Sequence, residues 1–361
     1  MGQLLSEPVL EKETNYGGNE KVIFAISSMQ GWRVSMEDAH IAILSLAEEL
    51  ERINKEKQNC VNENSENNET DKNNEIDKNL SFFGVFDGHS GGLISKYASK
   101  ELHKILINEE EFKLKNYDKA LKSAFFKLDD QMQQDEELLN CEAGSTAVVS
   151  LITDKTLYIA NCGDSRAIIS TNGKASALST DHKPTLPDEK TRIYNSGGFL
   201  QSGRVNGKLA VSRSLGDFIY KSNTSLPSDE QTITANPDIF IKEITKDDEF
   251  IVLACDGVWD YMTNEQVIEF IREGIANRLG LSQIAENLLN ECASEKEEVM
   301  KKPSYDNMTM IIVGFLHGRT KEEYYNMIKE RYIKEHPDKQ LTNTNNNSEI
   351  VEIKSTINSN S

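Results

Sequence analysis

The sequence predicts an α+β fold, a β-sandwich with α-helices packed outside it. Short segments rich in β-branched and aromatic residues recur along the chain, and segments with helical periodicity lie between them. Segments 145–153 and 157–161 are joined by a short connection with Asp154 and Lys155 at its tip, which favours an antiparallel hairpin. A doubly wound nucleotide-binding fold would need regular alternation and a glycine-rich first turn, which this sequence lacks. The pattern therefore favours stacked sheets with helices outside.

The expected strands are apolar segments whose composition suits a buried sheet. They are 22–28, 82–86, 147–152, 157–161, 167–170, 250–254 and 308–315. Helical periodicity with one apolar stripe appears at 93–106, 121–128 and 267–289. In a further segment, 321–334, five apolar or aromatic residues recur at helical spacing among charges, which predicts a terminal helix that docks on the rest.

Composition divides the chain into three parts. We expect an N-terminal segment at 1–19, one main domain at 20–318, and a C-terminal helix with a disordered tail at 319–361. Within the main domain, residues 48–80 are rich in Asn, Glu, Asp and Lys and poor in apolar side chains. Such a segment buries too little surface to offset its chain entropy, so we expect a disordered insertion there. The Asn and Ser bias from about residue 341 predicts a loose tail.

Bulk properties exclude several function classes. The 361 residues carry a formal net charge of −19, which argues against binding nucleic acid or acidic lipid through clustered basic residues. The five cysteines are scattered without CxxC spacing, so neither a disulfide framework nor a zinc site is indicated. No apolar run approaches the roughly 20 residues that span a bilayer. We expect a soluble monomer in the reducing cytoplasm, with the nucleus as a second location.

The N-terminus carries a lipidation signal. Residues 1–6 read MGQLLS, which fits the pattern for myristoylation of Gly2 after removal of the methionine. A single myristoyl chain anchors only marginally, and the mixed-charge segment that follows offers no polybasic second signal. Any membrane contact is therefore expected to be weak and reversible.

Two apolar strands run directly into an Asp-Gly pair. Segment 81–89 reads SFFGVFDGH and segment 250–260 reads FIVLACDGVWD, which places Asp87 and Asp256 at strand ends. The glycine allows a sharp turn and leaves room for a cation or water, and the carbonyl of Gly88 can itself be a ligand. Asp-Gly is also a common turn dipeptide, but its recurrence after two strongly apolar strands favours a site for hard divalent cations.

Other polar residues at the margins of apolar segments extend this hypothesis. Glu37 and Asp38 follow Arg33 closely, and although an adjacent acidic pair is often a solvated face, an arginine beside cations can grip phosphate oxygens. His89 follows the first Asp-Gly and is either structural or a proton donor to a leaving group. Two further carboxylates would reach the same sheet edge unless they serve as loop or cap residues: Asp164 and Asp306.

Eight ordered blocks of this sequence resemble a known family. They are SMQGWRVSMEDAH (28–40), FFGVFDGHSGG (82–92), GSTAVV (144–149), NCGDSRA (161–167), DHKP (181–184), RVNGKLAVSRSLGD (204–217), IVLACDGVWD (251–260) and DNMT (306–309). Their order and spacing are similar to those of the metal-dependent Ser/Thr protein phosphatases of type 2C, over about residues 20–317. The resemblance implies a four-layer αββα sandwich of two antiparallel sheets, with a two-metal centre at one end.

The resemblance also implies a role for each site residue. Asp87 would bridge two Mg²⁺ or Mn²⁺ ions, Gly88 would offer its carbonyl, and Glu37 would serve the same metal partly through water. The second ion would be held by Asp256 and Asp306, with Asp38 nearby. A weaker third ion would lie between Asp164 and Asp256. Arg33 would bind phosphate, His89 would be the general acid, and a metal-bridging hydroxide would attack phosphoserine or phosphothreonine in protein substrates.

The regions in which this chain differs from the family pattern are expected to affect the choice of substrate. A variable flap beside the active site is expected at 217–237, and only a short helix and tail follow the catalytic region. Two other functions stay open. A catalytically inert module could hold phosphorylated partners, although such relatives lack some acidic ligands, and a metal-dependent nucleic-acid phosphodiesterase would fit the cations but not the acidic charge.

Overall fold

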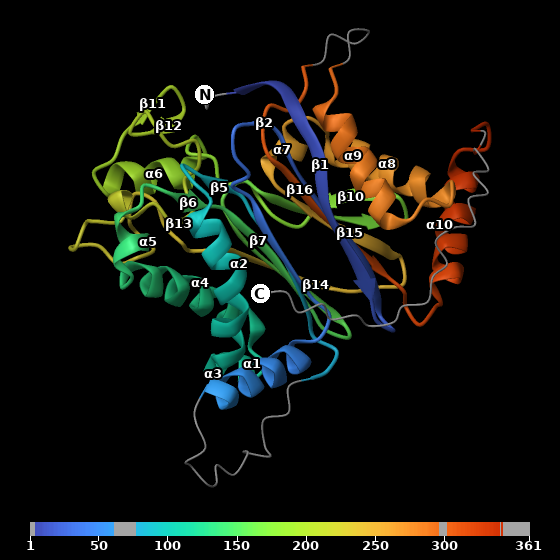
Figure 1. Ribbon diagram of the computed structural model, residues 1–361, viewed down its shortest axis with the longest axis horizontal. Helices are drawn as coiled ribbons and strands as arrows, with labels where there is room; N and C mark the ends of the chain where they lie inside the picture. The colour runs from blue at the N-terminus through green and yellow to red at the C-terminus, as the bar shows by residue number, and fades with distance from the viewer. Residues whose placement is uncertain (1–3, 61–76, 296–301, 340, 342–361) are drawn as a thin grey trace.

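Two β-sheets packed face to face form the centre of the protein, and helices cover the outer face of each sheet (Figure 1). The computed structural model describes residues 4–60, 77–295, 302–339 and 341. The six-stranded sheet has the order β1 (Leu4–Gly18), β2 (Val22–Arg33), β16 (Met308–Phe315), β15 (Asp248–Ala254), β9 (Arg166–Thr171), β10 (Lys174–Ala177). The five-stranded sheet has the order β14 (Asp238–Glu243), β8 (Thr156–Cys162), β7 (Ala147–Ile152), β4 (Ser81–Phe86), β3 (Ala39–Ile43). Every pairing within these sheets is antiparallel, which confirms the predicted α+β sandwich.

Strand β4 shows how the sequence builds these layers. All six of its residues are buried, because side chains that alternate along a strand face a core on either side. Phe83 and Val85 belong to the core between the sheets, where the Phe83 ring lies 5.4 Å from that of Phe24. Phe82 and Phe86 point the other way, into the core beneath the helices. A continuous apolar run therefore marks a strand covered on both faces.

Each sheet has its own helical layer. Over the five-stranded sheet lie α2 (Leu93–Asn108) and α4 (Tyr117–Gln133), with the shorter α1 (Leu46–Cys60), α3 (Glu110–Lys113) and α5 (Glu136–Asn140) beside them. Over the six-stranded sheet lie α8 (Asn264–Ala276), α9 (Leu281–Ala293) and α10 (Lys321–Glu335). The predicted 145–161 hairpin is present, since β7 pairs with β8 from Ile152↔Leu157 outwards. None of the helices within the described ranges is long and apolar enough to cross a bilayer.

Two segments differ from the expectations. Residues 4–18, expected only as an N-terminal segment, form the edge strand β1, whose mostly exposed, charge-rich sequence hides the usual strand pattern. The predicted disorder at 48–80 is wrong for its first part, because α1 extends to Cys60. Leu46 and Ile53 are buried in the helical core, and Arg52 pairs with two glutamates of its own helix, so sparse apolar residues suffice when neighbours cover them. Residues 61–76 lie outside the described ranges.

The predicted C-terminal helix is present as α10. Thr320 and Glu323 form a reciprocal capping box at its start. Arg272 of α8 is almost fully buried beneath it and pairs with Glu335 at 2.6 Å and with the buried Glu249 at 3.0 Å. The expected tail falls outside the described residues, apart from the single residue 341.

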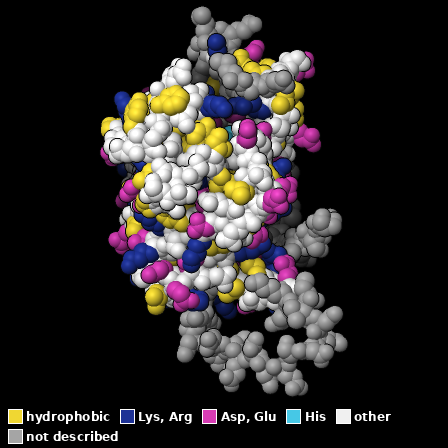
Figure 2. All heavy atoms as spheres, turned by 90° about the vertical axis from the view of Figure 1, so that its left-hand side faces the viewer, with side chains coloured by type: hydrophobic (Ala, Val, Ile, Leu, Met, Phe, Trp, Pro, Cys, Tyr) yellow, Lys and Arg dark blue, Asp and Glu magenta, His cyan; other side chains and the backbone are white. Residues whose placement is uncertain are grey.

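A separate lobe and a small sheet complete the end of the sandwich that holds the site. The lobe contains α6 (Pro187–Asn195) and the hairpin β11 (Leu200–Gln201) and β12 (Arg204–Val205). The small sheet has the order β13 (Leu215–Gly216), β6 (Gly144–Ser145), β5 (Gly88–His89). On the face turned to the viewer in Figure 2, acidic side chains are spread among neutral and basic ones.

The buried ion pair between Arg272 and Glu249 leads to a testable prediction about stability. Substitution Arg272→Met leaves the buried Glu249 without this partner, so we expect the free energy of unfolding to fall by about 3 kcal/mol. Chemical denaturation measures this change. The matched control is Arg278→Met, which removes a more exposed pair with Glu322 and should cost about 1 kcal/mol or less. Equal losses in the two variants would contradict the prediction.

Candidate active site

The loops that carry the acidic residues meet at one end of the sandwich because neighbouring strands run in opposite directions. The end of β15 lies beside the start of β16, with Ala254 paired to Met310. The end of β4 likewise lies beside the start of β3, with Phe86 paired to Ala39. Side chains that follow one strand and precede its neighbour are therefore brought together, although they lie far apart in sequence.

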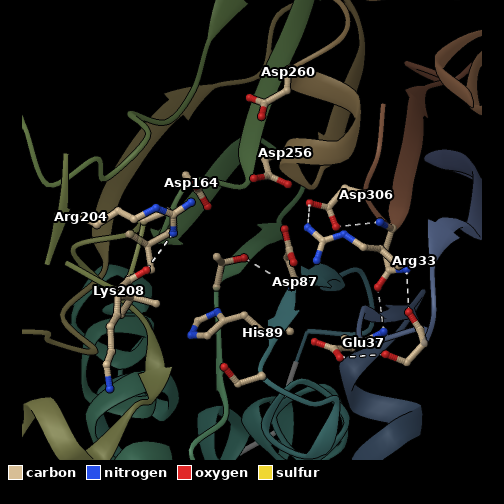
Figure 3. Close-up of a pocket in the computed structure, with 18 of the residues that line it drawn as sticks. Arg33, Glu37, Asp87, His89, Asp164, Arg204, Lys208, Asp256, Asp260 and Asp306 are labelled. Atoms are coloured by element: carbon tan, nitrogen blue, oxygen red, sulfur yellow. Dashed lines mark hydrogen bonds and ion pairs between the residues drawn. The ribbon is translucent and has the colours of Figure 1, made fainter. Parts of the chain in front are cut away.

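The predicted carboxylates line a single cavity of about 500 Å³ (Figure 3). Residues from eight separate blocks of sequence reach it. The predicted site residues that line it are Arg33, Glu37, Asp87, Gly88, His89, Asp164, Asp256 and Asp306. Asp38 is not among the lining residues, because it lies buried beneath the cavity floor, where Thr309 Oγ1 donates a 2.7 Å hydrogen bond to its carboxylate. Ligand atoms of Asp38, Asp87 and Cys255 lie within 4.8 Å of one another.

The cavity concentrates negative charge where water is scarce. Burial, together with the neighbouring carboxylates, raises the pKa of Asp87 and of Asp256 well above the usual value. Burial raises the pKa of Asp38 to about 6, with a further contribution from the charge of Asp306. The pKa of Asp306 is also raised by burial, although Arg33 opposes the shift. Bound cations would remove this repulsion.

The loop that carries Glu37 packs closely against the loop that follows Asp87, through a close approach at Gly88 and hydrogen bonds of the Glu37 carboxylate. A Cβ atom on Gly88 would overlap the carbonyl oxygen of Glu37, so only glycine allows this approach. The Glu37 carboxylate accepts hydrogen bonds from Ser35 Oγ at 2.9 Å and from the Gly91 N–H at 3.1 Å. Glu37 therefore lies at the rim of the cavity with its carboxylate oriented by the loop that follows Asp87.

Arg33 is the last residue of β2, and its side chain is held by the segment that precedes β16. Its Nη2 lies 2.5 Å from Asp306 Oδ2, and its Nε donates to the Tyr305 carbonyl at 2.9 Å. About a third of each side chain of the Arg33 and Asp306 pair is exposed. The guanidinium therefore has a fixed base and a face toward the cavity, the arrangement that planar phosphate recognition needs.

His89 has a partner that the sequence did not indicate. Its Nε2 lies 2.7 Å from the Oδ2 atom of Asp217, a buried residue that follows β13. Burial disfavours the charged imidazolium, but the charge and hydrogen bond of Asp217 outweigh it, so the pKa of His89 is raised. The sequence places Asp217 at the end of the block 204–217 without revealing its contact with a residue 128 positions earlier.

The structure adds four charged residues to the site: Lys183, Arg204, Lys208 and Asp260. Asp260 follows Asp256 by four residues across the one-turn helix α7 (Asp256–Trp259), a spacing that could have indicated it. Lys183 donates to Asp164 from the DHKP block, whose function the sequence left open. The expected flap at 217–237 does not line the cavity. Segment 204–211, which begins with β12, does so instead, and Figure 3 shows Arg204 and Lys208 on the side of the cavity opposite Arg33.

Comparison with known proteins identifies the family. The family model of protein phosphatase 2C matches residues 23–298. The curated relative "Protein phosphatase 2C homolog 2" of Schizosaccharomyces pombe is 46% identical over 92% of this chain and 83% of its own length. A relative of the same description from Hypocrea jecorina is 44% identical over 92% of this chain and 71% of its own length.

Solved structures support the fold. A serine-threonine phosphatase 2C from Toxoplasma gondii matches with a TM-score of 0.65 and 21% identity, covering 84% of this chain and 100% of that one. A Caenorhabditis elegans sex determining protein matches with a TM-score of 0.66 and 23% identity, covering 87% of this chain and 68% of that one. Together with the family match and the relatives, these findings confirm the resemblance seen in the sequence. The chain belongs to the protein phosphatase 2C family and is a serine/threonine protein phosphatase.

Proposed function

We propose that this protein hydrolyses phosphoserine and phosphothreonine in proteins with the help of two divalent cations, Mg²⁺ or Mn²⁺. One observation carries the proposal: Asp87, Asp256 and Asp306 meet in a single cavity whose walls also hold Arg33 and His89. Carboxylates, a phosphate-binding arginine and a histidine proton donor are the groups that metal-assisted hydrolysis of a phosphate ester requires.

The donor set fits hard cations. The predicted ligands are carboxylate oxygens and one carbonyl, which Mg²⁺ and Mn²⁺ prefer. The Oδ1 atom of Asp38 is buried and accepts no hydrogen bond within the described part of the chain, so an ordered water or a cation would satisfy it. Asp87, Gly88 and Glu37 would hold one ion, and Asp256 with Asp306 the other. Asp164 with Asp256 would hold a weaker third ion.

The side chains around the ions would divide the remaining work. When bound, the cations would lower the pKa of water and so supply the nucleophile, and they would neutralise charge on the phosphate. Arg33 would orient the phosphate through its planar guanidinium. His89 would give a proton to the serine or threonine oxygen as it departs.

A cysteine nucleophile is not supported. Cys162 and Cys255 lie within two residues of a site residue in sequence, and both are fully buried. Burial raises the pKa of Cys162 to about 12, and it raises that of Cys255 well above the usual value. Neither thiol would form the reactive thiolate at neutral pH.

The two alternatives fit less well. An inert phosphoprotein-binding module has no need of the carboxylates and the histidine, yet Asp87, Asp256 and Asp306 line one cavity together with His89. A nucleic-acid phosphodiesterase conflicts with the net charge of −19 and with the acidic side chains spread over the face in Figure 2. Parallel assays with a phosphopeptide and with bis-p-nitrophenyl phosphate, a phosphodiester, would separate the three functions.

We further propose that the protein acts as a monomer in the cytoplasm, with a share in the nucleus. Gly2 lies outside the described residues, so its myristoylation and the weak membrane contact that would follow stay predictions.

The first test removes single carboxylates. With Mn²⁺ present, Asp87→Asn and Asp256→Asn should each lower the rate of phosphopeptide hydrolysis by about 100-fold or more, because direct ligands matter at least as much as the groups that orient them. The control is Asp229→Asn, an exposed residue outside the cavity, which should keep the wild-type rate. Full activity in either ligand variant would overturn the assignment.

The second test concerns metal-free stability. The cavity carboxyls keep their protons to higher pH when folded, so they make the metal-free protein less stable as pH rises above about 4, the unfolded pKa, and for Asp38 this continues to about pH 6. Removing one repelling charge with Asp87→Asn should therefore raise the metal-free melting temperature at pH 7.5 by about 2 °C or more. Added Mn²⁺ should raise the melting temperature of the wild type and not of the variant. The opposite pattern would show that these groups do not repel one another.

A third test addresses the N-terminus. Coexpression with an N-myristoyltransferase should add a myristoyl group to the intact protein, detected by mass spectrometry. Gly2→Ala removes the N-terminal glycine that the signal requires and should abolish the added mass. An unmodified wild type under conditions that acylate a control substrate would refute the signal.

A further inference from the structure

Asp217 occupies a constrained position beside His89. It adopts a left-handed conformation with φ of 53°, which is costly for a residue with a side chain, and it is 2% exposed. Its Oδ2 atom accepts hydrogen bonds from His89 Nε2 at 2.7 Å and from Ser214 Oγ at 2.5 Å. The Asp217 carboxylate thus links the cavity histidine to the turn that follows β13.

The small sheet is shaped around this pair. In it, Gly144 lies between the other two strands, paired with His89 on one side and with Gly216 on the other. A Cβ atom at Gly144 would overlap the Asp217 carboxylate and lie 2.5 Å from His89 Nε2. The glycine therefore leaves the space in which the histidine and the carboxylate meet.

A buried ion pair holds the turn that carries Asp217. Asp129 of α4 accepts the Gly216 N–H at 2.9 Å, and each of its oxygens accepts from Lys221 Nζ at 2.8 Å. Lys221 also donates to the Ser214 carbonyl at 2.9 Å. Both charged side chains are less than a tenth exposed. Burial of an ion pair is weak evidence for stability, so its placement across the turn favours a role in fixing geometry.

The contact determines which nitrogen of His89 can give a proton. The Asp217 carboxylate is an acceptor, so the Nε2 atom that faces it carries a hydrogen. Nδ1 is then the ring nitrogen that is left for the substrate. As a proton donor the ring is an imidazolium, with a hydrogen on both nitrogens, so the contact fixes the direction in which Nδ1–H points; a freely rotating ring would align an N–H with the substrate for only part of the time.

We propose that Asp217 is a positioning residue that fixes the ring orientation of His89, so that Nδ1–H of the imidazolium faces the departing serine or threonine oxygen, and that the Asp129–Lys221 pair holds Asp217 in place. As the P–O bond breaks, the substrate oxygen keeps the bonding electron pair and takes the Nδ1 proton. The imidazole is left neutral, with its Nε2–H still bound to Asp217. This inference rests on the proposed function, in which His89 is the general acid.

Leaving-group chemistry distinguishes this role from a merely structural one. A serine oxygen is a poor leaving group and needs a proton as it departs, whereas p-nitrophenolate leaves readily without one. A variant that only loosens the fold or weakens metal binding slows both reactions alike. A variant that misplaces the general acid slows the phosphoserine reaction selectively.

The experiment measures kcat and KM for a phosphoserine peptide and for p-nitrophenyl phosphate at saturating Mn²⁺. With Asp217→Asn, we expect kcat for the peptide to fall by about 100-fold or more, and kcat for p-nitrophenyl phosphate by less than about 10-fold. Asparagine keeps the shape and tolerates the left-handed turn, but its amide can donate to Nε2 as well as accept from it, so it neither requires a hydrogen on Nε2 nor holds the ring as the carboxylate does. KM for the peptide should change little, because Asp217 does not face the cavity.

A second variant keeps the test informative if Asp217→Asn fails to fold. Asp129→Asn weakens the hold on the turn from α4 and should produce the same selectivity at smaller amplitude. The matched control is Asp130→Asn, the exposed neighbour on the same helix, which should leave both rates unchanged.

Equal losses on the two substrates, or no loss on either, in a folded Asp217→Asn protein would overturn the inference while leaving the phosphatase assignment intact. A wild-type protein that hydrolyses neither substrate would overturn the proposed function and this inference with it. In the ¹⁵N spectrum of His89, the wild type should show Nε2–H and Asp217→Asn should lose it, and an unchanged spectrum would also count against the inference.

Discussion

Repulsion among half-buried carboxylates is the constraint on which the rest of this structure depends. Asp87, Asp256 and Asp306 are carried by three different strand ends, and the antiparallel sandwich gathers them at one cavity. Without counter-charge they oppose folding, as their raised pKa values show. The two sheets and their helical layers therefore supply more than a scaffold. Their buried cores provide the free energy that keeps mutually repelling groups in contact with each other.

Basic side chains offset part of this charge repulsion, and glycines allow the close backbone contacts in the site. Arg33 neutralises Asp306, and Lys183 neutralises Asp164, so the periphery of the cluster is paired while its centre is left for cations. Gly88 and Gly144 allow backbone to approach where any larger residue would collide with Glu37 or with the pair of His89 and Asp217. The site thus combines charge pairing at its edges with close backbone contact in its middle.

The sequence predicted the layers and the acidic cluster because both leave local signals. Continuous apolar runs such as that of β4 indicate strands covered on both faces, and Asp-Gly after such runs marked two strand ends. What the sequence could not show was contact between distant segments, such as that of Asp217 with His89 or that of segment 204–211 with the cavity. The sequence did not indicate α1, because Leu46 and Ile53 stabilise that helix only through the core that they contact. Contacts between remote segments depend on the fold, so composition cannot reveal them.

The edge strand β1 determines how an acyl group would behave. Two register shifts and Pro8 interrupt its pairing near the start, and its acidic side chains discourage further strands from adding to the open edge. Only one residue separates Gly2 from the first residue of this strand, which corresponds to a leash of at most about 7 Å. A lipid there would keep the start of β1 close to a bilayer, so the substrates within reach would be those whose phosphorylated segments lie close to the lipid headgroups.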